Sequence, residues 1–125
     1  MSDNRREFTR VNVPIEAELQ LEERCVATRV SDVSMVGAFL AGCEAIPVGT
    51  KCRVVVFLDT RAGKTRIEAD GRVVRSGEAG VGIEFEDLVG LDSYWHLRSL
   101  VVYNAKDPDA AEREVDEHLG IRRRG

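Results

Sequence analysis

The chain has 125 residues, of which 43% are hydrophobic and 32% charged, and its formal net charge is −4 at neutral pH. This length and composition predict one folded domain with a buried core and exclude a disordered chain. The acidic balance argues against a protein that coats nucleic acid, because binding to phosphate backbones needs a broad basic surface. An anionic ligand would therefore have to be held by a local cluster of arginines.

The amino terminus lacks the apolar run of a signal peptide, and no stretch is apolar enough for a membrane helix. We therefore expect a cytoplasmic protein without membrane insertion. Cys25, Cys43 and Cys52 show no CxxC spacing and fall in or beside apolar runs, so they are expected to be reduced thiols. No metal site is expected, because the two histidines are far apart in the sequence and have no thiols nearby.

Alternating apolar and polar residues predict strands through the first two thirds of the chain. Between Val11 and Leu21 the apolar residues take the odd positions, which predicts a strand with one face in the core. Pro14 places this strand at an edge or beside a bulge. After a turn at Glu22-Glu23, residues 25–30 predict the second strand of a hairpin. A turn from Asp32 then leads to a short third strand at 37–41.

Three further strands are predicted by the apolar run at 54–58 and by the alternation at 65–75 and 81–85. Six short strands without helices between them indicate an antiparallel barrel or sandwich. We prefer the barrel, because closing the sheet removes the strand edges that would otherwise promote aggregation. The expected fold is thus mainly β, a small six-stranded antiparallel barrel with one or two helices packed on it at the carboxyl end.

The pattern changes to helical spacing after residue 91. Apolar residues recur three and four apart over 92–104, with Asp92 as the expected cap, and Tyr94 and Trp95 are assigned to the core or a barrel plug in preference to a stacking platform. A second helix is expected to begin at Asp107-Pro108 and to end at Gly120, before a solvated tail. Its apolar stripe is thin, so it either packs weakly or serves a partner. We divide the chain into a barrel domain at 1–104 and a helical extension with a basic tail at 105–125.

Three arginines, Arg5, Arg6 and Arg10, precede the first strand. Such a cluster is commonly a solvated arm. In a barrel, however, this arm can cross the mouth beside the segment that begins at Asp32. The planar fork of arginine donates two parallel hydrogen bonds to O6 and N7 of guanine or to phosphate oxygens. The arm is therefore a candidate site for a guanine nucleotide.

The segment Asp32-Val33-Ser34-Met35-Val36-Gly37 has two interpretations that are compatible with each other. In the first, Asp32 and Ser34 bond to the backbone of their own turn and Gly37 supplies a positive φ. In the second, Asp32 accepts hydrogen bonds from N1 and N2 of guanine, while Ser34 donates to phosphate or ribose. One turn can perform both tasks.

The RxxxR motif at 6–10 and the DxSxxG motif at 32–37, joined by a hairpin and followed by four strands and a helix, resemble a PilZ domain over about residues 5–104. The resemblance implies a bacterial, non-enzymatic receptor for cyclic di-GMP. Arg6 and Arg10 would hold guanine and phosphate, and Asp32, Ser34 and Gly37 would form the opposing wall. In similar proteins an arginine at the position of Arg5 accompanies the binding of a stacked pair of ligands.

Ligand binding is then expected to fix a mobile arm across the barrel mouth and so present a new surface to an unidentified protein effector. No catalytic residues and no cofactor are expected. The alternative is an adaptor of the same fold that binds no ligand and works through its terminal helix and tail. A small barrel that binds single-stranded RNA is disfavoured by the acidic balance and the few aromatics expected on the surface.

Overall fold

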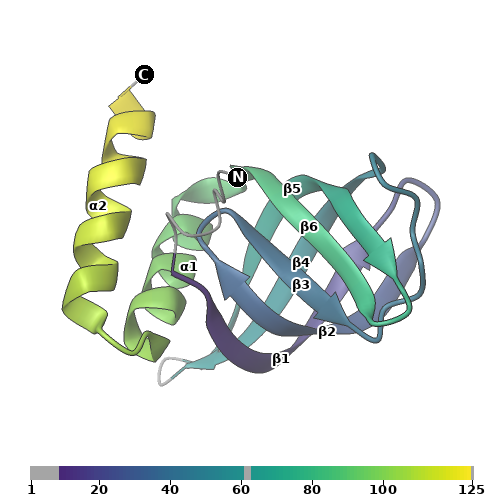
Figure 1. Cartoon of the computed structure of the whole chain (residues 1–125), viewed down its shortest axis with the longest axis horizontal. Helices are drawn as coiled ribbons and strands as arrows, with labels where there is room; N and C mark the ends of the chain where they lie inside the picture. Colours follow the sequence, from purple (N-terminus) through teal and green to yellow (C-terminus); the bar gives the residue numbers. More distant parts are fainter. Residues whose placement is uncertain (1–8, 61–62, 125) are drawn as a thin grey trace.

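The computed structural model describes residues 9–60 and 63–124, with the side chains of Thr60 and of residues 117–124 outside the description. Within these residues, six strands form a closed antiparallel barrel and two helices follow it (Figure 1). The predicted six-stranded barrel is confirmed. The strands are β1 (Val11–Gln20), β2 (Cys25–Ser34), β3 (Gly37–Ala41), β4 (Lys51–Thr60), β5 (Gly63–Gly77) and β6 (Gly80–Leu88), and the helices are α1 (Gly90–Asn104) and α2 (Pro108–Arg124).

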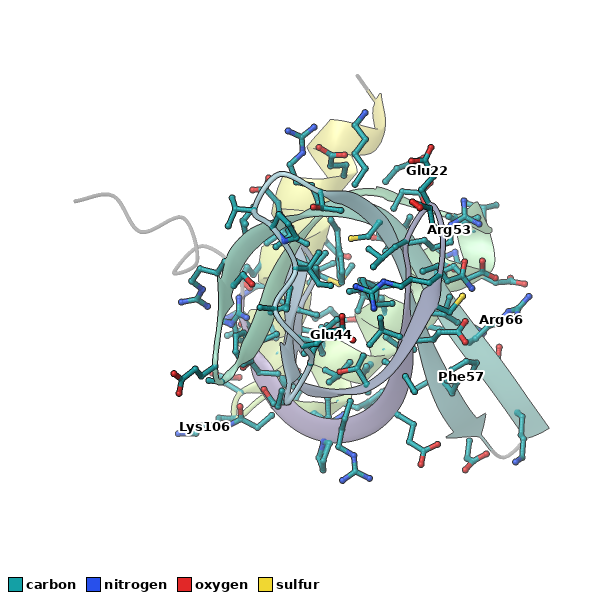
Figure 2. All side chains as sticks on the ribbon, turned by 90° about the vertical axis from the view of Figure 1, so that its right-hand side faces the viewer. Glu22, Glu44, Arg53, Phe57, Arg66 and Lys106 are labelled. Carbon is teal, nitrogen blue, oxygen red and sulfur yellow. The ribbon has the colours of Figure 1, made fainter. Side chains whose placement is uncertain are left out.

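The order of strands around the ring is β1-β2-β3-β6-β5-β4. The ring closes where residues Ala17–Gln20 of β1 pair with Arg53–Val56 of β4. Beyond that closure the β4–β5 hairpin continues outward, and its paired residues Phe57 and Arg66 lie on the part that projects from the ring when the barrel is viewed from its end (Figure 2).

The core fills the interior of the barrel. The odd residues of β1 point inward as their alternation predicts, and Leu19 has no exposed surface. Burying each large aliphatic side chain contributes roughly 1.5–3 kcal/mol, so this lining holds the ring together. The largest fully buried side chains are those of Leu19, Leu40, Ile46, Ile67, Leu97, Val30, Val33, Val54, Val55, Val73, Val81 and Val101.

Four shifts of register interrupt the pairing of the strands. In β1 the register shifts between Asn12 and Ile15, which confirms the bulge expected beside Pro14. In β2 the register against β3 shifts between Val30 and Asp32. The register of β5 against β6 shifts twice, between Asp70 and Gly71 and between Val73 and Arg75. At Ser31 of β2 and between Val73 and Arg75 of β5, the extra residue reverses the face to which the following side chains point.

The turn that was expected to start at Asp32 is shorter than the sequence suggested. β2 runs through Ser34, because Asp32 and Val33 pair with β1 on one side and with β3 on the other. Only Met35 and Val36 form the turn before Gly37. Asp32 is therefore held in paired backbone on both sides.

Helix α1 begins earlier than predicted, at Gly90, and Asp92 is not its cap. Val89 occupies the cap position without a side-chain hydrogen bond, and Asp92 lies in the first turn. The start of the helix is instead fixed to β5, since the Glu68 N–H donates to Ser93 Oγ (3.0 Å) and the Val89 N–H donates to the Glu68 carbonyl (2.9 Å).

The assignment of Trp95 to the core is wrong, since its side chain is 50% exposed, whereas Tyr94 does pack partly buried against the core. The buried face of α1 is set by Ser93, Leu97 and Val101, four residues apart. Trp95 is two residues from Leu97, which at 3.6 residues per turn places it about 200° around the helix.

Helix α2 begins as predicted, with Asp107 Oδ1 accepting from the Ala110 N–H (3.1 Å). It does not end at Gly120 as expected, because the backbone stays helical through Arg124. A glycine inside a helix costs only about 1 kcal/mol, which the neighbouring turns offset.

Helix α1 lies between the barrel and α2 (Figure 1). Ala111 and Val115 of α2 are buried, and Arg98 of α1 bonds to Glu112 (3.1 Å) and Asp116 (3.0 Å) of α2. Burial alone would lower the pKa of Arg98, but its hydrogen bonds to the two carboxylates outweigh that effect and the pKa is raised. Within the described part of the chain, neither helix has the length and apolarity needed to cross a membrane.

Candidate functional site

The structure brings one residue of each motif into direct contact. Arg10, just before β1, pairs with Asp32 of β2, and its Nε donates to Asp32 Oδ1 over 2.9 Å while its Nη2 donates to the same oxygen. The two side chains are 29% and 25% exposed, so the pair is partly screened from water. The hydroxyl of Ser31 donates to the other carboxylate oxygen over 3.3 Å. The predicted approach of the arm to the Asp32 segment is therefore present at Arg10.

The bulge in β2 determines where Asp32 points. Val30 and Val33 both face the core and lie three residues apart, so one residue between them is extra in the alternation. Without that extra residue Asp32 would share the inward face of Val30. The bulge at Ser31 instead directs the carboxylate outward, toward Arg10.

Ser34 and Gly37 have structural roles that are visible without a ligand. Ser34 is 1% exposed and its Oγ accepts from the Val36 N–H over 3.2 Å, which closes the turn. Gly37 is not among the glycines with positive φ, so that part of the prediction is wrong. Glycine is required there because a Cβ would lie 2.5 Å from the carbonyl oxygen of Ile83 on the neighbouring strand β6.

Arg5 and Arg6 lie outside the described residues. Their predicted roles, the grip of Arg6 on guanine or phosphate and the association of Arg5 with a stacked pair of ligands, are not tested. Arg10, Asp32, Ser34 and Gly37 are the site residues for which the structure gives a position.

A groove beside Asp32 contains two residues that sequence reasoning missed. It has a volume of about 390 Å³, and Asp32, Phe39 and Arg75 all line it. The end of the β5–β6 hairpin completes the lining through Ser76, Gly77, Ala79 and Gly80. The guanidinium of Arg75 lies over the ring of Phe39, 5.7 Å from its centre. Among the described residues Arg75 has no ion-pair partner, so its charge remains available to a ligand.

The Arg10–Asp32 pair resembles the contact that a guanine would make. A guanidinium presents neighbouring N–H donors to a carboxylate, and the Watson–Crick edge of guanine presents N1–H and N2–H in a similar arrangement. Arg10 therefore donates hydrogen bonds to Asp32 from N–H groups of the kind that a guanine base would supply. Asp32 also lines the groove, whereas Arg10 does not.

A larger groove of about 790 Å³ lies between β1, β4, β5 and α1, and none of the predicted site residues lines it. Its charged residues are Glu16, Asp59 and Lys64, so carboxylates outnumber cations there. This balance opposes a ligand with phosphates. The groove at Asp32 is the better candidate for a nucleotide.

Comparisons with known proteins agree with this architecture. The family model of the PilZ domain matches residues 4–102. No curated protein sequence matches the chain.

Among solved structures, the inhibitor of motility MotI/DgrA of Bacillus subtilis superposes with a TM-score of 0.65 at 18% identity, covering 79% of this chain and 50% of that one. The chain thus spans about half the length of MotI/DgrA. The PilZ domain of CeSA from a cellulose-synthesizing bacterium gives 0.52 at 21% identity, over 74% of this chain and 93% of that one. The PilZ domain of YcgR from Escherichia coli, solved with cyclic di-GMP, gives 0.52 at 18% identity, over 93% and 98%. At these identities the likeness establishes the fold.

Proposed function

The chain belongs to the PilZ domain family, and we propose that it is a non-catalytic receptor for cyclic di-GMP. The observation that carries this proposal is the contact between Arg10 and Asp32 at the rim of a groove also lined by Arg75. The contact joins the RxxxR and DxSxxG motifs, which are intact in this sequence. The ligand bound in the YcgR structure supports the choice of nucleotide.

In the proposed complex, guanine replaces Arg10 as the hydrogen-bond donor to Asp32. The freed guanidinium then donates to O6 and N7 of the base or to a phosphate oxygen, as arginine forks do at such groups. The ion pair that is lost is partly exposed, so breaking it costs little, about 0–1 kcal/mol. Arg5 and Arg6 are proposed to add contacts from the same arm, and Arg5 to favour a stacked pair of ligands.

The signal is proposed to leave the site through the arm. The backbone N–H of Thr9 donates to the carboxylate of Glu114 on α2. Thr9 adjoins Arg10, so a ligand that moves Arg10 away from Asp32 also disturbs this contact. Helix α2 would then change its position or mobility, and a protein effector would recognise the altered surface.

Calorimetric titration of the purified chain with cyclic di-GMP tests the receptor function, with GTP and cyclic GMP as controls for selectivity. Arg10→Ala removes a bidentate contact worth roughly 1–3 kcal/mol, so affinity should fall about tenfold or more. Arg66→Ala is the matched control, because Arg66 projects on the β4–β5 hairpin outside the groove lining (Figure 2). Absence of binding by the unsubstituted chain, or equal affinity of Arg10→Ala, would contradict the proposal.

The alternative of an adaptor that binds no ligand is favoured by one observation. Leu91, Trp95 and Tyr103 on α1 are 73%, 50% and 80% exposed, which is unusual for large apolar side chains on one helix. Such residues are typical of protein contact surfaces. The calorimetric titration distinguishes a receptor from an adaptor, because only the receptor gives a heat of binding with the dinucleotide.

A further inference from the structure

Four residues form a continuous row across the outside of the barrel. The strand registers pair Asp32 with Phe39, Phe39 with Gly82, and Gly82 with Arg75. The row therefore crosses β2, β3, β6 and β5 in turn. It connects the carboxylate contacted by Arg10 to an arginine that belongs to neither motif.

Both ends of this row face outward because of bulges. In β5, Val73 is fully buried and Arg75 lies two residues later, so strict alternation would direct Arg75 into the core. The register shift between Val73 and Arg75 adds one residue, and Val74 and Arg75 are both exposed. Asp32 is turned outward in the same way by the bulge in β2. Bulges that redirect side chains are concentrated beside functional sites, and here two of them direct charged groups to one groove.

Gly82, in the middle of the row, provides the space for Arg75. A Cβ on Gly82 would lie 3.2 Å from Arg75 Cβ and 3.4 Å from its Nε, so the arginine side chain lies across this glycine. In that position its guanidinium extends over strand β6 and reaches the ring of Phe39 at 5.7 Å. The ring and the glycine thus hold the planar group against the barrel surface.

We propose that Arg75, supported by Phe39 and Gly82, is a ligand-binding residue whose guanidinium plane stacks on a guanine base of the dinucleotide. This inference rests on the proposed receptor function. Guanidinium planes stack on nucleobases, and aromatic rings stabilise such stacks from the opposite face. Asp32, in the same groove, would accept from the edge of the same base. One base is then read by its face and by its edge.

Calorimetric titration with cyclic di-GMP of Arg75→Ala, Arg75→Lys and Gly82→Ala tests the inference, with Arg66→Ala as the control for loss of one surface arginine. Loss of a stacking contact should weaken binding by Arg75→Ala about tenfold. Arg75→Lys keeps the positive charge but lacks the planar group, so it should bind the dinucleotide nearly as weakly as Arg75→Ala does. Gly82→Ala should weaken binding less, by displacing the guanidinium. Thermal unfolding of each variant verifies that the barrel is intact.

The outcomes separate this inference from the receptor function. If the unsubstituted chain does not bind, both are overturned. The unsubstituted chain and Arg10→Ala establish whether the receptor function holds. If the chain binds, if Arg10→Ala weakens binding, and if Arg75→Ala leaves the affinity unchanged, then only the inference about Arg75 is overturned. Full affinity of Arg75→Lys would also overturn the inference. The positive charge alone, for example beside a phosphate, would then explain the contribution of Arg75 to binding.

Discussion

The outer face of the barrel at Asp32 and the helical side at α2 differ in how they are held. Asp32, Phe39, Gly82 and Arg75 all lie in strands that pair on both sides, so their backbones are fixed by the closed ring. Helix α2 packs mainly on α1, through Ala111, Val115 and the Arg98 ion pairs. Its contact with the chain before β1 is the bond from Thr9 to Glu114.

This difference suggests a division of tasks. Recognition benefits from groups that need no reorganisation on binding, whereas transmission needs an element that moves at low cost. The strand face meets the first requirement and α2 meets the second. The predictions below disturb one region and ask whether the other responds.

The largest expected effect comes from closing the space at Gly37. A Cβ there meets the Ile83 carbonyl at 2.5 Å, so Gly37→Ala must push β3 from β6. Overpacking of this kind should lower the free energy of unfolding by roughly 1–3 kcal/mol. Gly77→Ala is the matched control, since nothing lies within 4 Å of its Cβ. Equal stability of the two variants in urea unfolding would contradict the role assigned to Gly37.

A smaller effect is expected from Arg98→Ala. The Arg98 side chain is 16% exposed and joins two carboxylates of α2, so its loss should destabilise the docking of α2 by about 1 kcal/mol. Amide hydrogen exchange should become faster in α2 while the strands of the barrel keep their protection. Arg113→Ala, an exposed arginine of α2, serves as the control. Equal acceleration in the barrel strands would show that α2 is not a separable element.

The relay predicts a ligand-dependent change in the same helix. Saturating cyclic di-GMP should alter amide exchange in α2 of the unsubstituted chain, because the Thr9–Glu114 contact is disturbed. In Glu114→Ala this contact is already absent, so the ligand should bind but change α2 little. A ligand response of α2 that persists unchanged in Glu114→Ala would contradict the proposed route.

A further prediction concerns the pH dependence of stability. Burial, followed by the negative charges of Asp70 and Glu86, raises the pKa of Cys52 to about 11. The folded state thus holds this proton more tightly than the unfolded state, whose thiol has its ordinary pKa near 9. The stability contributed by Cys52 is complete below that value and is lost as pH rises toward 11. Urea unfolding of Cys52→Ala should therefore show a shallower loss of stability over this range than the unsubstituted chain.

The sequence predicted the barrel because its alternation is regular where strands bury one face. Helical spacing and residue type misled at positions where tertiary packing decides, as at Trp95 and at the end of α2. Gly120 has the residue type that ends helices, yet the helix continues through it. The local sequence pattern does not predict that a helix continues through a glycine.

The sequence predicted those residues of the candidate site that belong to the two motifs. Arg75 and Phe39 were missed because their proximity depends on a bulge in β5 and on pairing between β3, β6 and β5, which are distant in sequence. The one available signal was Gly82, a glycine inside an alternating strand, which is typical of a close approach by another group. The positive φ expected at Gly37 was wrong for a related reason, since the constraint there comes from a neighbouring strand.

An NMR titration of the isotope-labelled chain with cyclic di-GMP tests the central claim most directly, because backbone amide shifts locate the ligand residue by residue. The account predicts that the largest shifts occur at Arg10, Asp32, Phe39, Gly82 and Arg75, with a weaker response in α2. Shifts concentrated in the groove between β1, β4 and α1, around Phe57 and Asn104, would contradict it, as would the absence of any shift.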